Sequence, residues 1–303
     1  MPIHPLLADL LPSVTGWTSH AAATASLGAG YRLPDVHVED LAVDGPHGQV
    51  AVRLYRPRGR AASGAGLVWA HGGGFAFGDL DMGEAHVVSA ELAARHGIVV
   101  ASVGYRLATP GAGYPVPLDD VHAAWCWFLD AAPALGATRL GIGGASAGAT
   151  LTTGAAVRVR DAGTRVPDAL LLAYPTLHFP TPALPDDQVD DLRRVPAAIR
   201  FLPATVLDMT RTYLGRLSGF PAEAMPGNGD VAGLPPTSVV LSEVDDLRPS
   251  GETFLLQLQD AGVPTRAMVA AGMLHGHLDI PPVPGLPAIG ESIDFLAAGL
   301  LED

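Results

Sequence analysis

Two kinds of hydrophobic pattern follow one another along the chain. From about residue 36, apolar residues occupy alternate positions in two short stretches, which indicates half-buried strands, and Gly45-Pro46-His47-Gly48 between them predicts a hairpin turn. Later apolar runs are short and continuous, as expected of strands buried on both faces of a mostly parallel sheet. These runs are residues 67–70, 98–103, 140–142, 169–174, 238–241 and 267–270.

Stretches with helical spacing separate these apolar runs. They are residues 85–95, 119–132, 147–160, 251–261 and 289–300. Repeated alternation of strand and helix is typical of an α/β architecture, in which helices cover both faces of one sheet. We therefore predict one α/β domain over residues 1–303, with a mostly parallel central sheet flanked by helices.

Two segments depart from this alternation. They are residues 1 to about 35, and about 178–225, where prolines and acidic residues surround a predicted helix at 205–217. Insertions that follow a strand end in α/β enzymes often lie over the active site. We expect these two segments to form a small helical cap, although a surface loop without function is the alternative.

Composition and charge exclude several classes of protein. Apolar residues make up 48% of the chain and charged residues 16%, which gives material for a large core and argues against disorder. The formal charge is -13, and all 18 basic residues are arginines. A negative surface repels phosphate backbones, so nucleic acid is not an expected partner, and the absence of lysine excludes a P-loop and Schiff-base chemistry.

The cysteine content and the N-terminus bear on location. Cys126 is the single cysteine, so no internal disulfide can form, and we expect its side chain to be buried in a helix. The first twelve residues contain three prolines and no basic region, unlike a secretory signal. No apolar run approaches the roughly 20 residues of a membrane span. We expect a cytoplasmic protein.

The most informative motif is Gly144-Ala145-Ser146-Ala147-Gly148, which follows the predicted strand at 140–142 and opens a predicted helix. In this strand-turn-helix context, the pattern G-x-S-x-G is the nucleophile elbow, whose glycines permit a sharp turn that exposes the serine. The pattern alone is weak in a chain with 36 glycines. Its position identifies Ser146 as the candidate nucleophile.

A second motif, His71-Gly72-Gly73-Gly74-Phe75, directly follows the predicted strand at 67–70. Consecutive glycines allow backbone N–H groups to converge, as an oxyanion hole requires. The expected donors are Gly73, Gly74 and Ala147, with His71 bracing the loop. A phosphate-binding loop is the alternative, but neither a lysine nor the spacing G-x-G-x-x-G is present.

A serine nucleophile needs a base, and the base needs an orienting acid. The predicted strand at 238–241 is followed by Asp245 and Asp246, and the strand at 267–270 is followed by His275 and His277. Open α/β sheets place their sites at these strand ends, and the order Ser, Asp, His is the one expected of α/β-hydrolases. The pattern itself does not choose within either pair.

With these motifs, the chain resembles the hormone-sensitive-lipase-like branch of the α/β-hydrolases over about residues 65–300. The stretch Gly104-Tyr105-Arg106-Leu107-Ala108 with Leu118-Asp119-Asp120 is also similar to that family, although Thr109 replaces its usual proline. The family pattern Asp-Pro-Leu-Arg-Asp aligns with residues 245–249 and selects Asp245, and its His-Gly-Phe selects His275. Ala145 and the sequence Gly148-Ala149-Thr150 depart from the family's elbow.

The resemblance implies a serine carboxylesterase that hydrolyses small esters, of short to medium acyl chain, through an acyl-enzyme and without a metal or organic cofactor. An amidase or deacetylase with the same triad is the first alternative, and a noncatalytic receptor is the second. A homodimer is possible by analogy with the family. Candidates for an apolar acyl pocket, most of which we expect to be ordinary core, are Leu6, Leu7, Leu10, Trp17, Phe75, Tyr174, Phe179, Phe201 and Met209.

Overall fold

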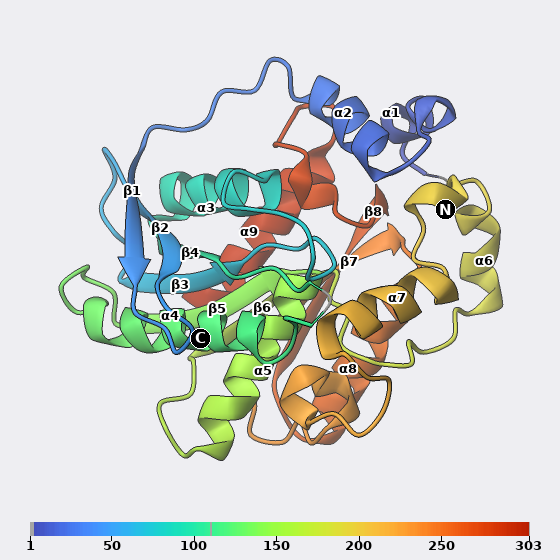
Figure 1. Ribbon diagram of the computed structural model, residues 1–303. Helices are drawn as coiled ribbons and strands as arrows, with labels where there is room; N and C mark the ends of the chain where they lie inside the picture. Colours follow the sequence, from blue (N-terminus) through green and yellow to red (C-terminus); the bar gives the residue numbers. More distant parts are fainter. Residues whose placement is uncertain (1–2, 110, 303) are drawn as a thin grey trace.

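A central sheet organises the chain (Figure 1). The computed structural model describes residues 3–109 and 111–302, and within them eight strands form the order β1-β2-β4-β3-β5-β6-β7-β8. The first three strands in this order pair antiparallel and the remaining pairs are parallel. The strands are β1 (Val36–Val43), β2 (Val50–Pro57), β3 (Ala65–Ala70), β4 (Val99–Gly104), β5 (Arg139–Ala145), β6 (Ala169–Ala173), β7 (Thr237–Val244) and β8 (Thr265–Leu274).

Helices cover both faces of the sheet, so the predicted α/β fold with a mostly parallel sheet is confirmed. One face packs against α3 (Gly83–His96) and α9 (Pro287–Leu301), and the other against α4 (Val116–Ala131), α5 (Ala147–Asp161) and α8 (Arg248–Asp260). Along β3, Leu67 and Trp69 pack in the core under α3 and α9, whereas Val68 packs in the core under α4, α5 and α8. A strand buried on both faces needs apolar residues at successive positions, which explains the continuous runs.

The two segments that depart from the α/β alternation meet beside the carboxyl ends of β7 and β8 (Figure 1). The N-terminal segment holds α1 (Pro5–Ala8), a short 3₁₀ turn η1 (Leu11–Ser13) and α2 (Trp17–Leu27). The second holds α6 (Asp186–Leu192), η2 (Ala197–Ile199), α7 (Pro203–Leu214) and η3 (Ala222–Ala224), and η4 (Pro226–Asn228) follows it. The expected helix at 205–217 is α7, which ends earlier because Gly215 adopts a left-handed conformation.

Cys126 corrects one expectation. Its side chain is exposed rather than buried, because it lies on the outward side of α4, one turn after His122. The neighbouring Trp125 and Phe128 point into the core instead. A helix places adjacent residues on different faces, so an apolar run is not buried throughout. Among the described residues, no helix has the length and apolar character needed to cross a membrane.

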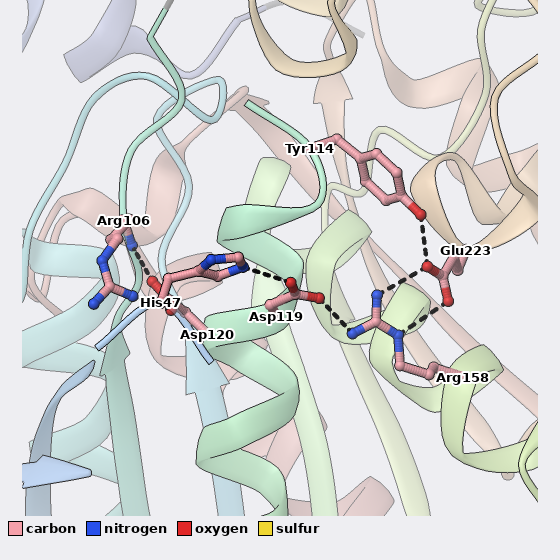
Figure 2. A network of polar contacts seen from close by, with 7 residues as sticks. All are labelled: His47, Arg106, Tyr114, Asp119, Asp120, Arg158 and Glu223. Carbon is pink, nitrogen blue, oxygen red and sulfur yellow. Dashed lines mark hydrogen bonds and ion pairs between the residues drawn. The ribbon is translucent and has the colours of Figure 1, made fainter. Parts of the chain in front are cut away.

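A network of polar contacts fastens the second segment to the sheet-flanking helices (Figure 2). Arg158 near the end of α5 donates to Asp119 of α4 at 2.7 Å and to both carboxylate oxygens of Glu223 in η3, at 3.0 and 2.8 Å. Tyr114 also donates to Glu223 at 2.6 Å, and His47 of the hairpin turn contacts Asp119 at 2.6 Å. The hydrogen bonds from Arg158 lower the pKa of Glu223 below its usual value.

We predict that Arg158→Leu lowers the free energy of unfolding by about 2 kcal/mol, because two half-buried carboxylates lose their shared charged partner. Urea denaturation measures the change. Arg211→Leu is the control, since Arg211 forms an exposed pair with Asp208 and its loss should cost less than about 0.5 kcal/mol. Equal costs for the two variants would contradict the role given to the network.

Candidate active site

Ser146 lies at a sharp turn between β5 and α5. Its backbone has φ 51° and ψ -116°, a conformation that non-glycine residues rarely adopt. The turn packs closely against the end of β3, because a Cβ atom on Gly148 would lie 2.2 Å from the carbonyl oxygen of Ala70. Only glycine fits at that position. The turn therefore has the strained geometry of a nucleophile elbow, and the serine N–H is held by the carbonyl of Ala173 at 2.9 Å.

A chain of two hydrogen bonds connects Ser146 to a carboxylate. Nε2 of His275 lies 2.8 Å from Oγ of Ser146, and its Nδ1 lies 2.7 Å from Oδ2 of Asp245. A carboxylate only accepts hydrogen bonds, so Nδ1 carries the proton and Nε2 is free to accept from the serine hydroxyl. Asp245 is buried, and its other oxygen accepts the N–H of Leu247 at 2.8 Å.

Electrostatics favour the protonated form of His275. Burial lowers its pKa, but the charge of Asp245 and its hydrogen bond outweigh burial, with smaller contributions from Glu84 and Asp246. The net effect is that the pKa of His275 is raised above its usual value. The surroundings therefore stabilise an imidazolium, which a base must become when it takes a proton from serine.

The contacts in the structure distinguish Asp245 from Asp246 and His275 from His277. Asp246 pairs with Arg200 at 2.7 Å rather than with the base, and it also accepts the N–H of Phe201 at 3.0 Å. His277 is buried between Ser242 and Ser292, with its two ring nitrogens 2.9 and 3.1 Å from their hydroxyls. Burial lowers the pKa of His277 to about 3, so this ring is neutral. Of the four candidates, Asp245 and His275 are the two that lie on the path to Ser146.

The glycine loop after β3 runs beside the serine. Gly73, Gly74 and Phe75 all have positive φ, at 100°, 60° and 67°. Within the described residues, we find no protein acceptor for the N–H groups of Gly73 and Gly74. Ala147 begins α5, and the first N–H groups of a helix have no partner inside it. The glycine loop and the first turn of α5 thus supply backbone donors next to the Ser146 turn, the kind of group that an oxyanion hole uses.

Tyr105 holds the start of this loop in place. Its hydroxyl donates to the carbonyls of His71 and Gly72 at 2.9 and 3.0 Å, and its ring stacks on the ring of His71 with centroids 4.4 Å apart. Burial lowers the pKa of His71, which suits a bracing residue rather than a proton carrier. The next residue, Arg106, binds Asp120 of α4 through its backbone N–H at 2.8 Å and through its guanidinium. The family-like motif at 104–108 therefore supports the loop.

Sequence reasoning missed two buried residues beside the triad, Glu84 and Tyr174. The Tyr174 hydroxyl donates to Glu84 at 2.6 Å, and its ring centroid lies 4.9 Å from that of His275. Tyr174 ends a predicted strand, and the sequence pattern indicates only a strand residue or a pocket residue. Glu84 lies in no recognisable motif, and a helical glutamate gives no sign in the sequence that it is buried.

A small cavity of about 20 Å³ adjoins the base. Trp17 and Phe201 form aromatic walls, and their ring centroids lie 5.2 Å apart. The ring centroid of Phe201 lies 4.6 Å from that of His275. Of the other acyl-pocket candidates, Leu7 and Phe75 are core residues, whereas Met209 lies next to Gly74. The full lining is Trp17, His20, Leu192, Val195, Ile199, Arg200, Phe201, Val244, Asp245, Asp246, Leu274 and His275.

Within residues 3–109 and 111–302, the acidic, histidine and cysteine side chains do not form a metal site. In the part of the chain that the structure describes, no three His, Cys, Asp or Glu side chains are grouped in a way that could bind one. The polar groups of the site instead bind one another.

Comparison with known proteins agrees with this geometry. A family model described as alpha/beta hydrolase fold matches residues 67–279. The chain is 33% identical over 258 residues to esterase LipI of Mycobacterium tuberculosis, covering 81% of this chain and 76% of that protein. It is 31% identical over 237 residues to an ethyl acetate hydrolase of Pseudomonas putida, covering 74% and 70%.

Solved structures give the same result. The hyperthermophilic esterase from the archaeon Pyrobaculum calidifontis superposes with a TM-score of 0.85 at 28% identity, over 99% of this chain and 98% of that one. The extent of the family match and the identity to curated relatives are sufficient to assign the family. The chain belongs to the hormone-sensitive-lipase-like branch of the alpha/beta hydrolase fold family.

Proposed function

We propose that this protein is a serine carboxylesterase. The observation that carries the proposal is the hydrogen-bonded chain from Ser146 through His275 to Asp245, set beside unpaired backbone N–H groups. The relatives described as an esterase and an ethyl acetate hydrolase support the same reaction class. The substrate is a small carboxylic ester, and the chain's own residues supply the nucleophile, base and oxyanion donors.

The reaction proceeds in two steps of acyl transfer. Oγ of Ser146 attacks the ester carbonyl while Nε2 of His275 takes its proton, and the negative oxygen accepts hydrogen bonds from Gly73, Gly74 and Ala147. His275 returns the proton to the departing alcohol. A water molecule, deprotonated by His275, then cleaves the acyl-enzyme, and Asp245 stabilises the imidazolium in both steps.

We further propose a preference for short acyl or alcohol groups. The cavity next to His275 has room for about one water-sized group, and the rings of Trp17 and Phe201 limit it. These two residues come from the two segments expected to form a cap. In this proposal, residues 1–35 and 178–225 determine which esters reach Ser146.

Substitution of each triad member tests the proposed reaction. Ser146→Ala, His275→Ala and Asp245→Asn should each lower kcat for p-nitrophenyl acetate by about 1,000-fold or more while circular dichroism stays unchanged. Asp246→Asn is the matched control, because Asp246 binds Arg200 rather than the base, and its kcat should fall by less than about tenfold. A larger loss in Asp246→Asn than in Asp245→Asn would reverse the assignment of the acid.

The protonation state of His275 controls the expected pH dependence. The base must be neutral to act, so kcat/KM should rise with pH through the pKa of His275 and then level off. Because the charge of Asp245 raises that pKa, the residual activity of Asp245→Asn should reach its plateau at lower pH than the wild type. Initial-rate assays with a soluble ester between pH 5 and 9 measure both profiles. A shift to higher pH would contradict the electrostatic role.

Esters of different acyl length test the proposed limit on substrate size. Wild type should turn over p-nitrophenyl acetate and butyrate faster than the octanoate, because the cavity beside His275, with Trp17 and Phe201 in its lining, is small. Phe201→Ala should raise kcat/KM for the octanoate relative to the acetate by about tenfold. An unchanged ratio would remove Phe201 from the specificity pocket. A wild type that cleaves matched anilides as fast as esters would favour an amidase instead.

A further inference from the structure

Glu84 is a buried carboxylate that the reaction described above does not use. It lies in the first turn of α3 and is only 3% exposed. Its Oε2 accepts the N–H of Gly72 at 2.8 Å, and its Oε1 accepts the hydroxyl of Tyr174 at 2.6 Å. Its backbone carbonyl accepts Nε1 of Trp69 at 2.7 Å, which fixes the helix turn against β3.

The Glu84 carboxylate lies close to the backbone on either side of the site, at Gly72 and at Gly276. A Cβ atom on Gly72 would be 2.5 Å from Oε2 of Glu84 and 3.1 Å from Cβ of Ser146. A Cβ on Gly276, the residue after His275, would be 3.8 Å from Oε1. Glu84 therefore binds the loop that carries Gly73 and Gly74 through Gly72, and it lies close to the segment that carries the base.

Tyr174 extends this support to the base. It follows β6, has φ 36°, and is buried, with its ring 4.9 Å from the ring of His275 and 5.0 Å from that of His277. A tyrosine in this conformation persists only when its surroundings hold it there. The hydrogen bond to Glu84 is one of the contacts that do so.

The charge of Glu84 is costly to bury. Among the described residues, no arginine forms an ion pair with it, although its position at the start of α3 gives it the favourable end of the helix dipole. A neutral glutamine of similar shape would avoid most of that cost. An ionised acid, unlike glutamine, offers two acceptor oxygens, and both are used here by Gly72 and Tyr174.

We propose that Glu84 is a positioning residue. Its ionised carboxylate holds the glycine loop that begins at Gly72, and the Tyr174 ring beside His275, in the reactive geometry. This inference rests on the proposed function, because the position of Gly72 matters only if the adjacent N–H groups stabilise an oxyanion. Both carboxylate oxygens face donors. Protonation or replacement by glutamine leaves one acceptor in place of two, so either the Gly72 N–H loses its partner or the Tyr174 hydroxyl must reverse and accept a hydrogen bond.

Ionisation of Glu84 then becomes part of the pH dependence. Burial and the charge of Asp279 raise the pKa of Glu84 to about 7, while hydrogen bonds from Tyr174 and Gly72 and the charge of His275 oppose that rise. The other ionisable groups facing it are Tyr105 and, beyond Asp279, Asp79. Because the ionised form is the productive one, activity is lost as pH falls through this pKa, in addition to the loss caused by protonation of His275.

The test compares Glu84→Gln with wild type on p-nitrophenyl acetate from pH 5 to 9. We expect kcat to fall by about 10- to 100-fold with KM changed less than about threefold, since the loop acts on the transition state. The acid limb of kcat should become shallower, because one of two ionisations is removed. Affinity for a methyl trifluoromethyl ketone, which forms a tetrahedral adduct with Ser146, should fall by a factor similar to that of kcat.

Glu91→Gln is the matched control. Glu91 lies two turns further along α3, is also nearly buried, and accepts the Tyr31 hydroxyl at 2.6 Å. The same substitution there can lower stability but should leave kcat and the acid limb as in wild type. Should Glu84→Gln fail to fold, Tyr174→Phe removes one of the two contacts and should lower kcat by about fivefold.

The outcomes separate this inference from the proposed function. Wild-type hydrolysis that is abolished in Ser146→Ala supports the esterase proposal independently of Glu84. If Glu84→Gln then keeps kcat within twofold of wild type and the same acid limb, Glu84 has no positioning role. Equal losses in Glu84→Gln and Glu91→Gln would also overturn it, because the effect would be one of general stability. A wild type inert on all esters overturns both proposals.

Discussion

The contact between the nucleophile turn and the end of β3 determines the geometry of the whole site. Gly148 lies against the carbonyls of Ala70 and His71, which leaves no room for a side chain. This contact holds Ser146 at positive φ and at the same time fixes where the glycine loop begins. The strain at one residue is tolerated because the parallel strands β3 and β5 hold both sides of the contact in register.

Parallel pairing also explains how much of the site the sequence predicts. The strand runs at 140–142, 238–241 and 267–270 all end at the same edge of the sheet, so residues that follow them converge without any knowledge of their contacts. Local patterns accordingly select Ser146 as the candidate nucleophile and narrow the candidate acid and base to two neighbouring pairs. They could not choose within each pair, because a shift of one or two residues after a strand depends on the turn that follows, such as the hydrogen bond from Leu247 to Asp245.

Residues that act through burial left no signal in the sequence. Glu84 is one of two acidic residues on the inner side of α3, and helical spacing alone does not distinguish it from a solvated glutamate. Cys126 is the reverse case, an apolar position on a helix that the fold turns outward. Both outcomes depend on how α3 and α4 rotate against the sheet, which is decided by packing of Val88, Leu92, Trp125 and Phe128 rather than by local preference.

Adjacent carboxylates at the end of β7 perform different tasks. Asp245 faces His275, whereas Asp246 binds Arg200 and the N–H of Phe201, the residue whose ring lies 4.6 Å from the ring of His275. One tight turn therefore fixes both the orientation of the base and the position of the segment at 178–225. Asp246 therefore anchors the backbone of Phe201 beside the turn that presents Asp245. The aromatic wall of the cavity and the candidate acid are consequently positioned by adjacent residues of one turn, which brings the segment at 178–225 close to the candidate base.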